Sequence, residues 1–289
     1  MIENKITKDV VVLYHADCND GFGAAWAAWK KFGDEADYIP IEHQMPLPEG
    51  LKGKQIFFTD IAPDEGSIKR LVNDNISVIA IDHHKTNELK MGLFKEYSFD
   101  NNHSGAVLAW KYFHPDKPVP KLLLFIEDID IWKWQYPETS TFISALDLYD
   151  YNFEIWDKIS SDIENSEKLK EYLSKGEIIN TYVKRVADDL VKHAQKIDFE
   201  GYEVYAINAH HPIKSFAVVT LREKYPPFAI AWFQEGDMIH VSLRSDGSID
   251  VSELVQKYGG GGHKAAAGFN FPAGQPFPWK IIKDKVSKS

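Results

Sequence analysis

The sequence is poor in cysteine: Cys18 is its single thiol in 289 residues. One cysteine cannot form a disulfide framework within a chain, and it cannot supply the thiolates of a cysteine-rich zinc site. No apolar run approaches the roughly 20 residues that span a bilayer. Residues 1–9 mix Lys, Glu and Asp, without the basic start and apolar stretch of a signal peptide. We therefore expect a cytoplasmic protein with no membrane partner.

The sequence also lacks an excess of positive charge. It has 33 Lys and Arg against 43 Asp and Glu, a net charge of −10. Residues 1–180 carry a balance of −12, whereas residues 181–289 carry +2. Proteins that process long nucleic acids usually present a basic stripe, because neutralising phosphates supplies much of their affinity. We therefore expect no groove for long DNA, and a cluster of metal-binding carboxylates would account for part of the acidity.

Apolar strand-like runs alternate with helical segments in the first half of the chain. Runs rich in β-branched and aromatic residues predict buried strands at 10–14, 56–59 and 76–81. Helices are predicted at 21–32, 65–73 and 104–113, the last with Ser104 as its N-cap. This alternation predicts an open parallel sheet, whose ligands bind at the carboxyl ends of the strands.

The second half of the chain has a different pattern. Residues 153–194 are helical in spacing, rich in charge and without a strand candidate. Strands are then predicted at 202–208, 216–219, 228–233 and 239–244, with a helix at 251–258. We therefore predict an α/β protein in three parts: a parallel-sheet domain at 1–152, a helical connector at 153–196 and a smaller mixed α/β domain at 197–289.

Four polar clusters follow the apolar segments of the first domain. They are His15-Ala-Asp17-Cys-Asn-Asp20, Thr59-Asp60, Asp82-His83-His84 and Glu127-Asp128-Ile-Asp130. Each cluster alone is typical of an ordinary surface loop, but four at consecutive element ends indicate one site at the sheet edge. Imidazole and carboxylate together suit Mn²⁺, Mg²⁺, Co²⁺ or Zn²⁺. One carboxylate can bridge two such ions about 3.5–4 Å apart, an arrangement that promotes in-line displacement at phosphorus.

A glycine-rich segment marks the last part of the chain. Gly259–Gly262 precede His263, and a run of small residues continues to Gly268. Successive glycines let the backbone approach a ligand closely and turn its N–H groups towards an anion. Arg244, at the end of a strand-like run, could offer a bidentate contact to phosphate, although alone it is typical of a surface charge.

Together these residues resemble the DHH/DHHA1 phosphoesterase superfamily, which includes nanoRNases, RecJ-like exonucleases and exopolyphosphatase-related proteins. Asp82-His83-His84 is the motif that names the superfamily, and residues 259–268 are similar to the motif of the DHHA1 domain. Residues 14–26 and Asp60 resemble its first and second motifs. The resemblance covers residues 10–271 and implies a DHH catalytic domain followed by a substrate-binding DHHA1 domain.

The resemblance implies a role for each matching residue. The implied metal ligands are His15, Asp17, Asp20, Asp60, His83 and Asp128 or Asp130. Asp60 would bridge two divalent cations, most simply Mn²⁺, with Mg²⁺ or Co²⁺ as alternatives. Asp82 would orient His83, and His84 would face the substrate phosphate as a catalytic residue. Substrate contacts would come from Arg244, Gly260, Gly261, Gly262 and His263.

Two positions depart from the superfamily pattern. Many members space their first two acids as Asp-x-Asp-Gly, whereas this chain has Asp17-x-x-Asp20-Gly21, which leaves Asp17 in doubt. In the fourth motif, Asp128 is favoured over Asp130 by its distance from the preceding apolar segment.

The implied activity is hydrolysis of a phosphodiester or phosphomonoester in a short oligonucleotide or small nucleotide by a two-metal-activated water. An inorganic polyphosphatase and an inactive nucleotide- or RNA-binding module are the alternatives. The sequence leaves open whether the chain forms a homodimer.

Overall fold

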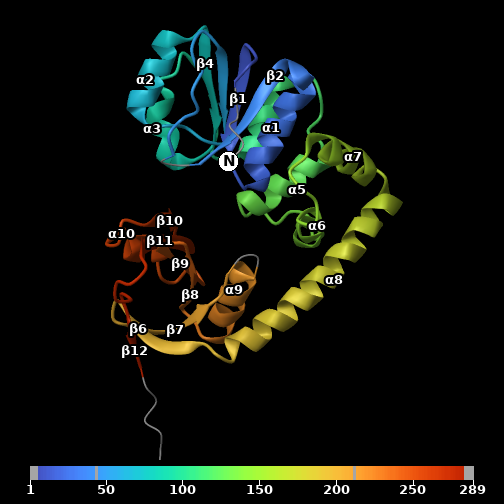
Figure 1. The fold of residues 1–289 in the computed structure, drawn as a ribbon. Coiled ribbons are helices and arrows are strands. Elements are labelled where there is room, and N and C mark those ends of the chain that lie inside the picture. Colours follow the sequence, from blue (N-terminus) through green and yellow to red (C-terminus); the bar gives the residue numbers. More distant parts are fainter. Residues whose placement is uncertain (1–5, 43–44, 211–212, 283–289) are drawn as a thin grey trace, which may run out of the picture. The chain divides into compact units, whose positions relative to one another are not determined.

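The computed structural model describes residues 6–42, 45–210 and 213–282. Contacts between residues divide the chain into two units, Met1–Glu177 and Ile178–Ser289. Figure 1 labels most of the helices and strands of both units. The α/β class predicted from the sequence is confirmed, with a parallel sheet in the first unit and a mixed sheet in the second.

The described residues of the first unit form a five-stranded sheet in the order β2-β1-β3-β4-β5. Its strands are β1 (Val10–His15), β2 (Ala36–Ile41), β3 (Gln55–Thr59), β4 (Ser77–Asp82) and β5 (Glu96–Phe99). Every neighbouring pair is parallel. The three predicted strands correspond to β1, β3 and β4, which occupy the centre of the sheet. Their apolar runs are continuous because helices cover both faces.

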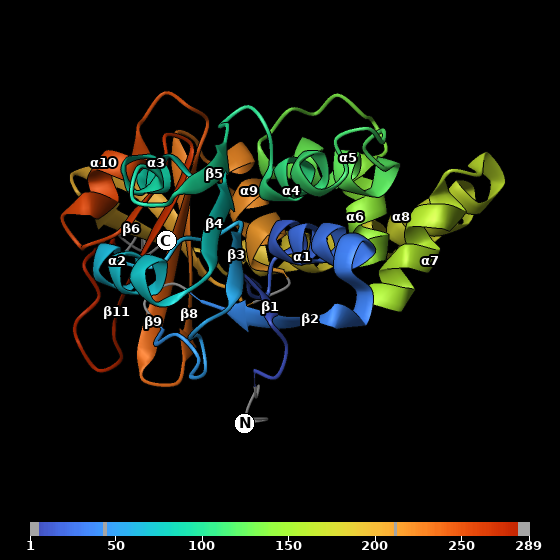
Figure 2. The same cartoon turned by 90° about the horizontal axis from the view of Figure 1, so that it is seen from above.

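Helices pack on both faces of this sheet (Figures 1 and 2). One face carries α1 (Asn19–Phe32) and α4 (Gly105–Phe113), and alternate sheet residues such as Val12, Phe57 and Ile79 pack against them. The other face carries α2 (Glu65–Asp74) and α3 (Glu88–Met91), which cover Leu13, Phe58 and Ala80. Ser104 caps α4 as predicted, because its Oγ accepts a hydrogen bond from the Val107 N–H at 3.3 Å.

Further helices extend the first unit beyond α1. They are α5 (Lys121–Asp130), α6 (Thr139–Leu146) and α7 (Phe153–Ile163), together with the 3₁₀ turns η1 (Gly33–Glu35) and η2 (Lys85–Asn87). Helix α8 (Ser166–Val191) begins in the first unit and ends in the second. The segment predicted as a connector, residues 153–196, therefore consists mainly of α7 and α8. No helix within the described ranges is long and apolar enough to cross a membrane.

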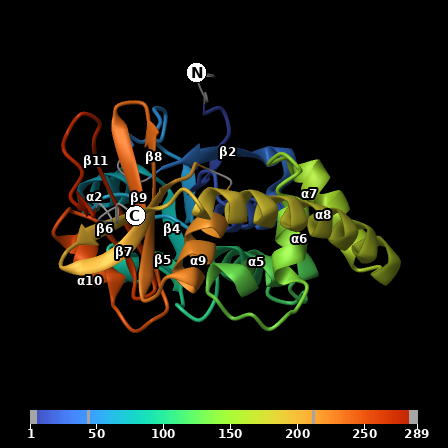
Figure 3. The ribbon, with the colours of Figure 1, turned by 90° about the horizontal axis from the view of Figure 1, so that it is seen from below.

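The second unit is built on a mixed sheet in the order β10-β11-β9-β8-β7-β6-β12. Its strands are β6 (Gln195–Phe199), β7 (Tyr202–Asn208), β8 (Phe228–Glu235), β9 (Met238–Ser245), β10 (Gly261–His263), β11 (Ala266–Pro272) and β12 (Lys280–Ile281). Only β7 and β8 pair in parallel among the described strands of this sheet. Helices α9 (Lys214–Lys224) and α10 (Val251–Gln256) pack on it, and Figure 3 shows α9 beside β8.

One strand prediction in this unit is wrong. Residues 216–219 lie in α9 and form no strand. Ala217, Val218 and Leu221 are the buried residues of this helix and pack against the sheet. Their i, i+1, i+4 spacing is that of one helical face, and it outweighs the β-branched composition of the segment.

Candidate metal site at the carboxyl edge of the parallel sheet

The carboxyl ends of three adjacent strands bring His and Asp residues of the first unit together. His15 ends β1, Asp60 follows β3, and Asp82 ends β4 directly before His83 and His84. The strands are neighbours in the order β1-β3-β4, so these residues share one edge of the sheet. The predicted convergence on this edge is therefore present.

Asp60 lies at the centre of the cluster. Its Oδ2 is 3.4 Å from His15 Nδ1, and its Oδ1 is 3.2 Å from His83 Nε2 and 3.7 Å from His84 Nδ1. The Asp60 side chain is fully buried and its backbone has a left-handed φ of 62°. Each carboxylate oxygen thus faces a different set of nitrogen atoms. This geometry suits a carboxylate that bridges two cations.

Two further carboxylates face His83. Its Nε2 is 3.6 Å from Asp20 Oδ2 and 3.5 Å from Asp130 Oδ2. Asp20, in the first turn of α1, also accepts hydrogen bonds from the N–H groups of Gly105 at 2.6 Å and Ala106 at 2.9 Å. The first turn of α4 therefore fixes the Asp20 carboxylate beside the cluster.

The donor atoms of this cluster fit divalent cations. Among the described residues, three sets of side chains each bring their potential ligand atoms within 4.8 Å of one another. The sets are His15, Cys18 and Asp60; Asp60, His83 and His84; and Asp20, His83 and Asp130. Both Asp60 oxygens, His83 Nε2 and Asp130 Oδ2 are buried, and within the described ranges they have no hydrogen-bond partner. Burying a carboxylate without such a partner is costly, and a bound cation would remove that cost.

The carboxylates also repel one another. Burial and the neighbouring Asp60 raise the pKa of Asp130 to about 6. Burial, Asp60 and Asp130 likewise raise the pKa of Asp20. Burial alone would raise the pKa of Asp60 as well, but contacts with His15 and His83 bring it below its usual range. The cluster therefore holds more negative charge than its histidines balance, which favours divalent cations.

Cys18 belongs to this cluster, although it is not among the ligands predicted from the sequence. Its sulfur lies near ligand atoms of His15 and Asp60. Burial, together with the charges of Asp60 and Asp20, raises the pKa of its thiol. Its position between Asp17 and Asp20, inside the first polar cluster, is the sequence feature that could have indicated this placement.

Asp82 contacts His84 as well as His83, the residue that it is predicted to orient. Its Oδ1 lies 2.8 Å from His84 Nδ1 and accepts the backbone N–H groups of His83 and His84, while Oδ2 accepts from Asn87 Nδ2 at 2.7 Å. Asp82 therefore orients the ring of His84, whereas its contact with His83, its predicted partner, is to the backbone N–H. This contact and the charge of Asp60 outweigh burial and raise the pKa of His84 to about 9.

The structure places Asp130 in the cluster and Asp128 outside it, contrary to the preference drawn from the sequence. Asp128 is buried, and its Oδ1 accepts the Gln135 N–H at 2.6 Å. Its Oδ2 accepts the Tyr136 N–H at 3.3 Å and the Thr139 hydroxyl at 2.6 Å. Asp128 thus holds the loop between α5 and α6. Two residues apart on a helix correspond to a rotation of about 200°, so both side chains cannot face the same cluster.

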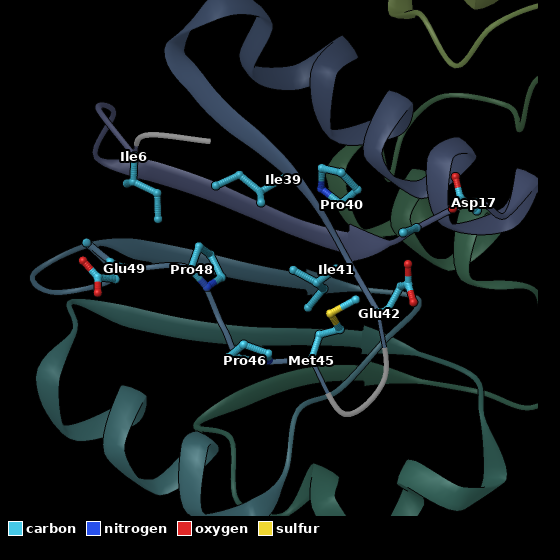
Figure 4. Close-up of a pocket in the computed structure, with 12 residues that line it drawn as sticks. Ile6, Asp17, Ile39, Pro40, Ile41, Glu42, Met45, Pro46, Pro48 and Glu49 are labelled. Atoms are coloured by element: carbon cyan, nitrogen blue, oxygen red, sulfur yellow. The ribbon is translucent and has the colours of Figure 1, made fainter. Parts of the chain in front are cut away.

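Asp17 also lies apart from the clustered ligand atoms. Its side chain is exposed, and it lines a pocket of about 860 Å³ along β2 (Figure 4). The lining of this pocket includes Ile39, Ile41, Met45 and Glu49, but not Asp60 or His83. This pocket lies beside the cluster of His and Asp side chains and does not contain it.

The predicted substrate contacts lie in the second unit. Arg244 on β9 pairs with Ala266 on β11, and Ala266 pairs with the backbone of His263 on β10. Burial lowers the pKa of Arg244, and burial together with the charge of Arg244 lowers the pKa of Lys214. The positive charges of Arg244 and Lys214 therefore repel each other, and a bound anion would relieve this repulsion.

The glycine-rich segment has a packing role in this sheet. A Cβ at Gly260 would lie 2.3 Å from the Gly268 carbonyl oxygen, and one at Gly262 would lie 2.5 Å from that of Ala266. Gly262 also has a φ of 139°, which L side chains rarely adopt. Close approach of the neighbouring strand therefore requires glycine at both positions.

Gly105→Ala is expected to lower both the affinity for metal and kcat by at least about tenfold. Mutation of residues that orient metal ligands has effects of this size. A Cβ at this position would lie 2.7 Å from both the Cβ and Oδ1 of Asp60, so the bridging carboxylate must move. Gly92→Ala is the matched control, because a Cβ there has no neighbour within 4 Å. Metal titration and steady-state kinetics provide the test. Equal behaviour of the two variants would show that the position of Asp60 is not critical.

Comparison with known proteins identifies the family. The DHHA1 domain family matches residues 202–279. The uncharacterized protein R106 of Acanthamoeba polyphaga mimivirus is 30% identical over an alignment of 301 positions, gaps included, which covers 93% of this chain and 69% of that protein. The oligoribonuclease NrnB of Bacillus subtilis is 27% identical over an alignment of 304 positions, gaps included, which covers 89% of this chain and 71% of that protein. The chain belongs to the DHH/DHHA1 phosphoesterase superfamily.

A solved structure agrees with this assignment at the level of the fold. A DHH domain from a protein described as a member of a ribosomal-protein family superposes with a TM-score of 0.57 at 12% identity, over 95% of this chain and 83% of that one. The DHHA1 match and the two related sequences confirm the superfamily resemblance found in the sequence, and the solved structure shows the same fold. As a DHH/DHHA1 protein the chain is a hydrolase of phosphoester bonds, and its clustered His and Asp residues agree with the metal dependence of DHH phosphoesterases.

Proposed function

We propose that this DHH/DHHA1 protein hydrolyses phosphodiester bonds in short oligoribonucleotides, using two divalent cations held around Asp60. The observation that carries the proposal is the fully buried Asp60 carboxylate, whose two oxygens face His15 on one side and His83 on the other at 3.4 and 3.2 Å. The similarity to an oligoribonuclease supports the choice of substrate. So does the balance of −12 in residues 1–180, because a short substrate needs few phosphate contacts.

Each residue of the cluster has a proposed role. Asp60 would contribute to both cations, and His15, Asp20, His83 and Asp130 would supply further ligands. When bound, the cations neutralise charge on the phosphate and lower the pKa of water towards 7. His84 is about one-third exposed, and Asp82 fixes its ring through Nδ1. Held in this way, His84 donates a hydrogen bond to the substrate phosphate.

The second unit is proposed to bind the nucleotide. Arg244 offers a half-buried guanidinium beside Lys214, and the backbone of residues 260–263 lies on the strands next to Arg244. These groups would contact a phosphate or a sugar of the nucleotide.

The direct test is a screen of hydrolysis in Mn²⁺ over dinucleotides, cyclic dinucleotides, 3′-phosphoadenosine 5′-phosphate and inorganic polyphosphate. Dinucleotides are expected to be the preferred substrates. Exclusive hydrolysis of polyphosphate would replace the proposal with the polyphosphatase alternative, and the absence of any turnover would favour a binding module.

Removal of metal is expected to abolish activity, and Mn²⁺ is expected to restore it best. Mg²⁺ or Co²⁺ should restore less, and Ca²⁺ little, because Ca²⁺ prefers six to eight oxygen ligands and fits a compact His/Asp site poorly. Mn²⁺ should also raise the free energy of unfolding, by about 2.7 kcal/mol at a hundredfold excess over Kd. Activity after chelation and thermal unfolding with each ion provide the test. Full activity once metal removal is verified contradicts the mechanism.

A further inference from the structure

Two tryptophans that follow Asp130 in the sequence expose their rings to solvent. Trp132 and Trp134 lie in the loop between α5 and α6, and they are 57% and 49% exposed. Their ring centroids are 5.8 Å apart with an interplanar angle of 86°. Tryptophan is highly buried on average, as Trp26 and Trp156 are in this chain. Two large aromatic rings side by side on the surface therefore require an explanation outside the core.

The backbone of this loop is strained at both tryptophans. Trp132 has a φ of 58° and Trp134 a φ of 52°, in the left-handed region that bulky side chains rarely adopt. Each such residue costs of order 1–3 kcal/mol and persists only where the surroundings impose it. Strain of this kind concentrates at functional sites, so the exposed pair is a candidate for ligand binding.

Buried acidic residues impose this conformation. The carbonyl oxygen of Asp128 accepts the N–H groups of Lys133 and Trp134, and its carboxylate accepts those of Gln135 and Tyr136. The Lys133 side chain, between the two tryptophans, pairs with the buried Glu127. The loop is therefore fixed at its polar groups while the two indole rings remain outside. A surface that is ordered before binding loses little entropy when a ligand arrives.

The loop with the two tryptophans directly follows Asp130, a residue of the proposed reaction centre. Asp130 Oδ2 is 3.5 Å from His83 Nε2, and Trp132 follows Asp130 by two residues. Two peptide units separate their Cα atoms by at most about 7.6 Å. The loop that carries both indole rings therefore starts at the cluster, next to a residue proposed to hold the cations.

We infer that Trp132 and Trp134 form a stacking platform for a nucleobase next to the scissile phosphate. This inference rests on the proposed function, and it specifies that the substrate carries bases. Aromatic side chains bind bases of single strands by stacking, which is worth about 1–3 kcal/mol per base and tolerates any sequence. Inorganic polyphosphate has no group that uses such a platform. The platform therefore favours oligonucleotides over polyphosphate at a site whose metal chemistry serves both.

The test compares a 5′-phosphorylated dinucleotide with its abasic analogue, which has the same phosphodiester without bases. Trp132→Ala and Trp134→Ala are each expected to lower the ratio of kcat/KM for the dinucleotide to that for the analogue by about 5- to 150-fold, the equivalent of the stacking energy. Trp132→Phe and Trp134→Phe should retain most of this ratio, because phenylalanine also stacks. Tyr97→Ala, which removes another exposed aromatic of the same unit, is the matched control and should leave the ratio unchanged.

A binding experiment separates this inference from the proposed function. Addition of the dinucleotide to metal-stripped protein should quench tryptophan fluorescence, and the double variant Trp132→Phe/Trp134→Phe should lose that quenching. If wild-type protein hydrolyses no phosphodiester but shows this quenching, the platform holds and the proposed activity fails. If the dinucleotide is hydrolysed but the double alanine variant keeps the wild-type ratio and quenching is absent, the platform is overturned and the activity stands.

Discussion

Asp60→Asn is expected to lower metal-dependent hydrolysis by more than about a hundredfold while the metal-free protein stays folded. Residues that only orient metal ligands are worth 10–100-fold in affinity or activity, and Asp60 faces three histidines directly. Asparagine matches aspartate in size and tolerates the left-handed φ of 62° at this position. It cannot supply the negative charge that a bridge between two cations requires.

Asp64→Asn is the control for this variant. Asp64 caps α2 by accepting the Ser67 N–H at 3.0 Å, and asparagine caps helices equally well. Metal content, kcat and circular dichroism of both variants provide the measurement. A folded Asp60→Asn protein with near-normal turnover would rule out Asp60 as the bridging ligand.

The centre of the fold could be predicted because buried parallel strands leave a strong sequence signal. Strands β1, β3 and β4 are continuous apolar runs, since helices cover both of their faces. The two edge strands were missed for the opposite reason. Strand β2 contains Pro40 and partly exposed residues, and β5 is only four residues long with Glu96 and Tyr97 exposed. Proline and charged side chains are typical of sheet edges, and they remove the pattern that predicts a strand.

The part of the candidate site that lies at the ends of strands could be predicted from the sequence. His15, Asp60 and His83 follow apolar runs directly, so the order of the strands brings them together. Residues that come from helices and loops carry no such signal. The choice between Asp128 and Asp130 depends on which side of α5 faces the cluster, and a short helix with buried residues on most of its surface does not reveal it. The partner of Asp82 likewise depends on how the chain turns after β4.

Asp130→Ala is expected to abolish binding of one of the two cations and to lower activity by more than about a hundredfold. The metal-free variant is nevertheless expected to be at least as stable as the metal-free wild type. The pKa of Asp130 is raised to about 6 in the folded chain, against an ordinary value of 3.8. The folded state therefore holds this proton more tightly than the unfolded state. An ionised Asp130 destabilises the metal-free fold above pH 6, and this cost disappears as the pH falls towards 4.

The stability of Asp130→Ala relative to the wild type should therefore depend on pH. The variant lacks the buried charge, so at pH 8 in chelator its free energy of unfolding should exceed that of the wild type by up to about 3 kcal/mol. Partial exposure of the side chain reduces this figure. The difference should shrink at pH 4 to 5, where the wild-type carboxyl group is protonated when folded. Urea unfolding at both pH values measures it.

Asp128→Ala is expected to show the reverse behaviour. It removes a buried carboxylate that accepts hydrogen bonds from Gln135, Tyr136 and Thr139, so the free energy of unfolding should fall by about 2–5 kcal/mol at pH 8. Asp128→Asn retains one acceptor oxygen and should lose less. Both Asp128 variants should still bind two cations, because the proposed ligands of the cations are other residues. Calorimetric titration with Mn²⁺ measures the number of cations bound. If Asp128→Ala loses a cation at unchanged stability while Asp130→Ala keeps both, then Asp128 is the ligand, as the sequence pattern alone had favoured.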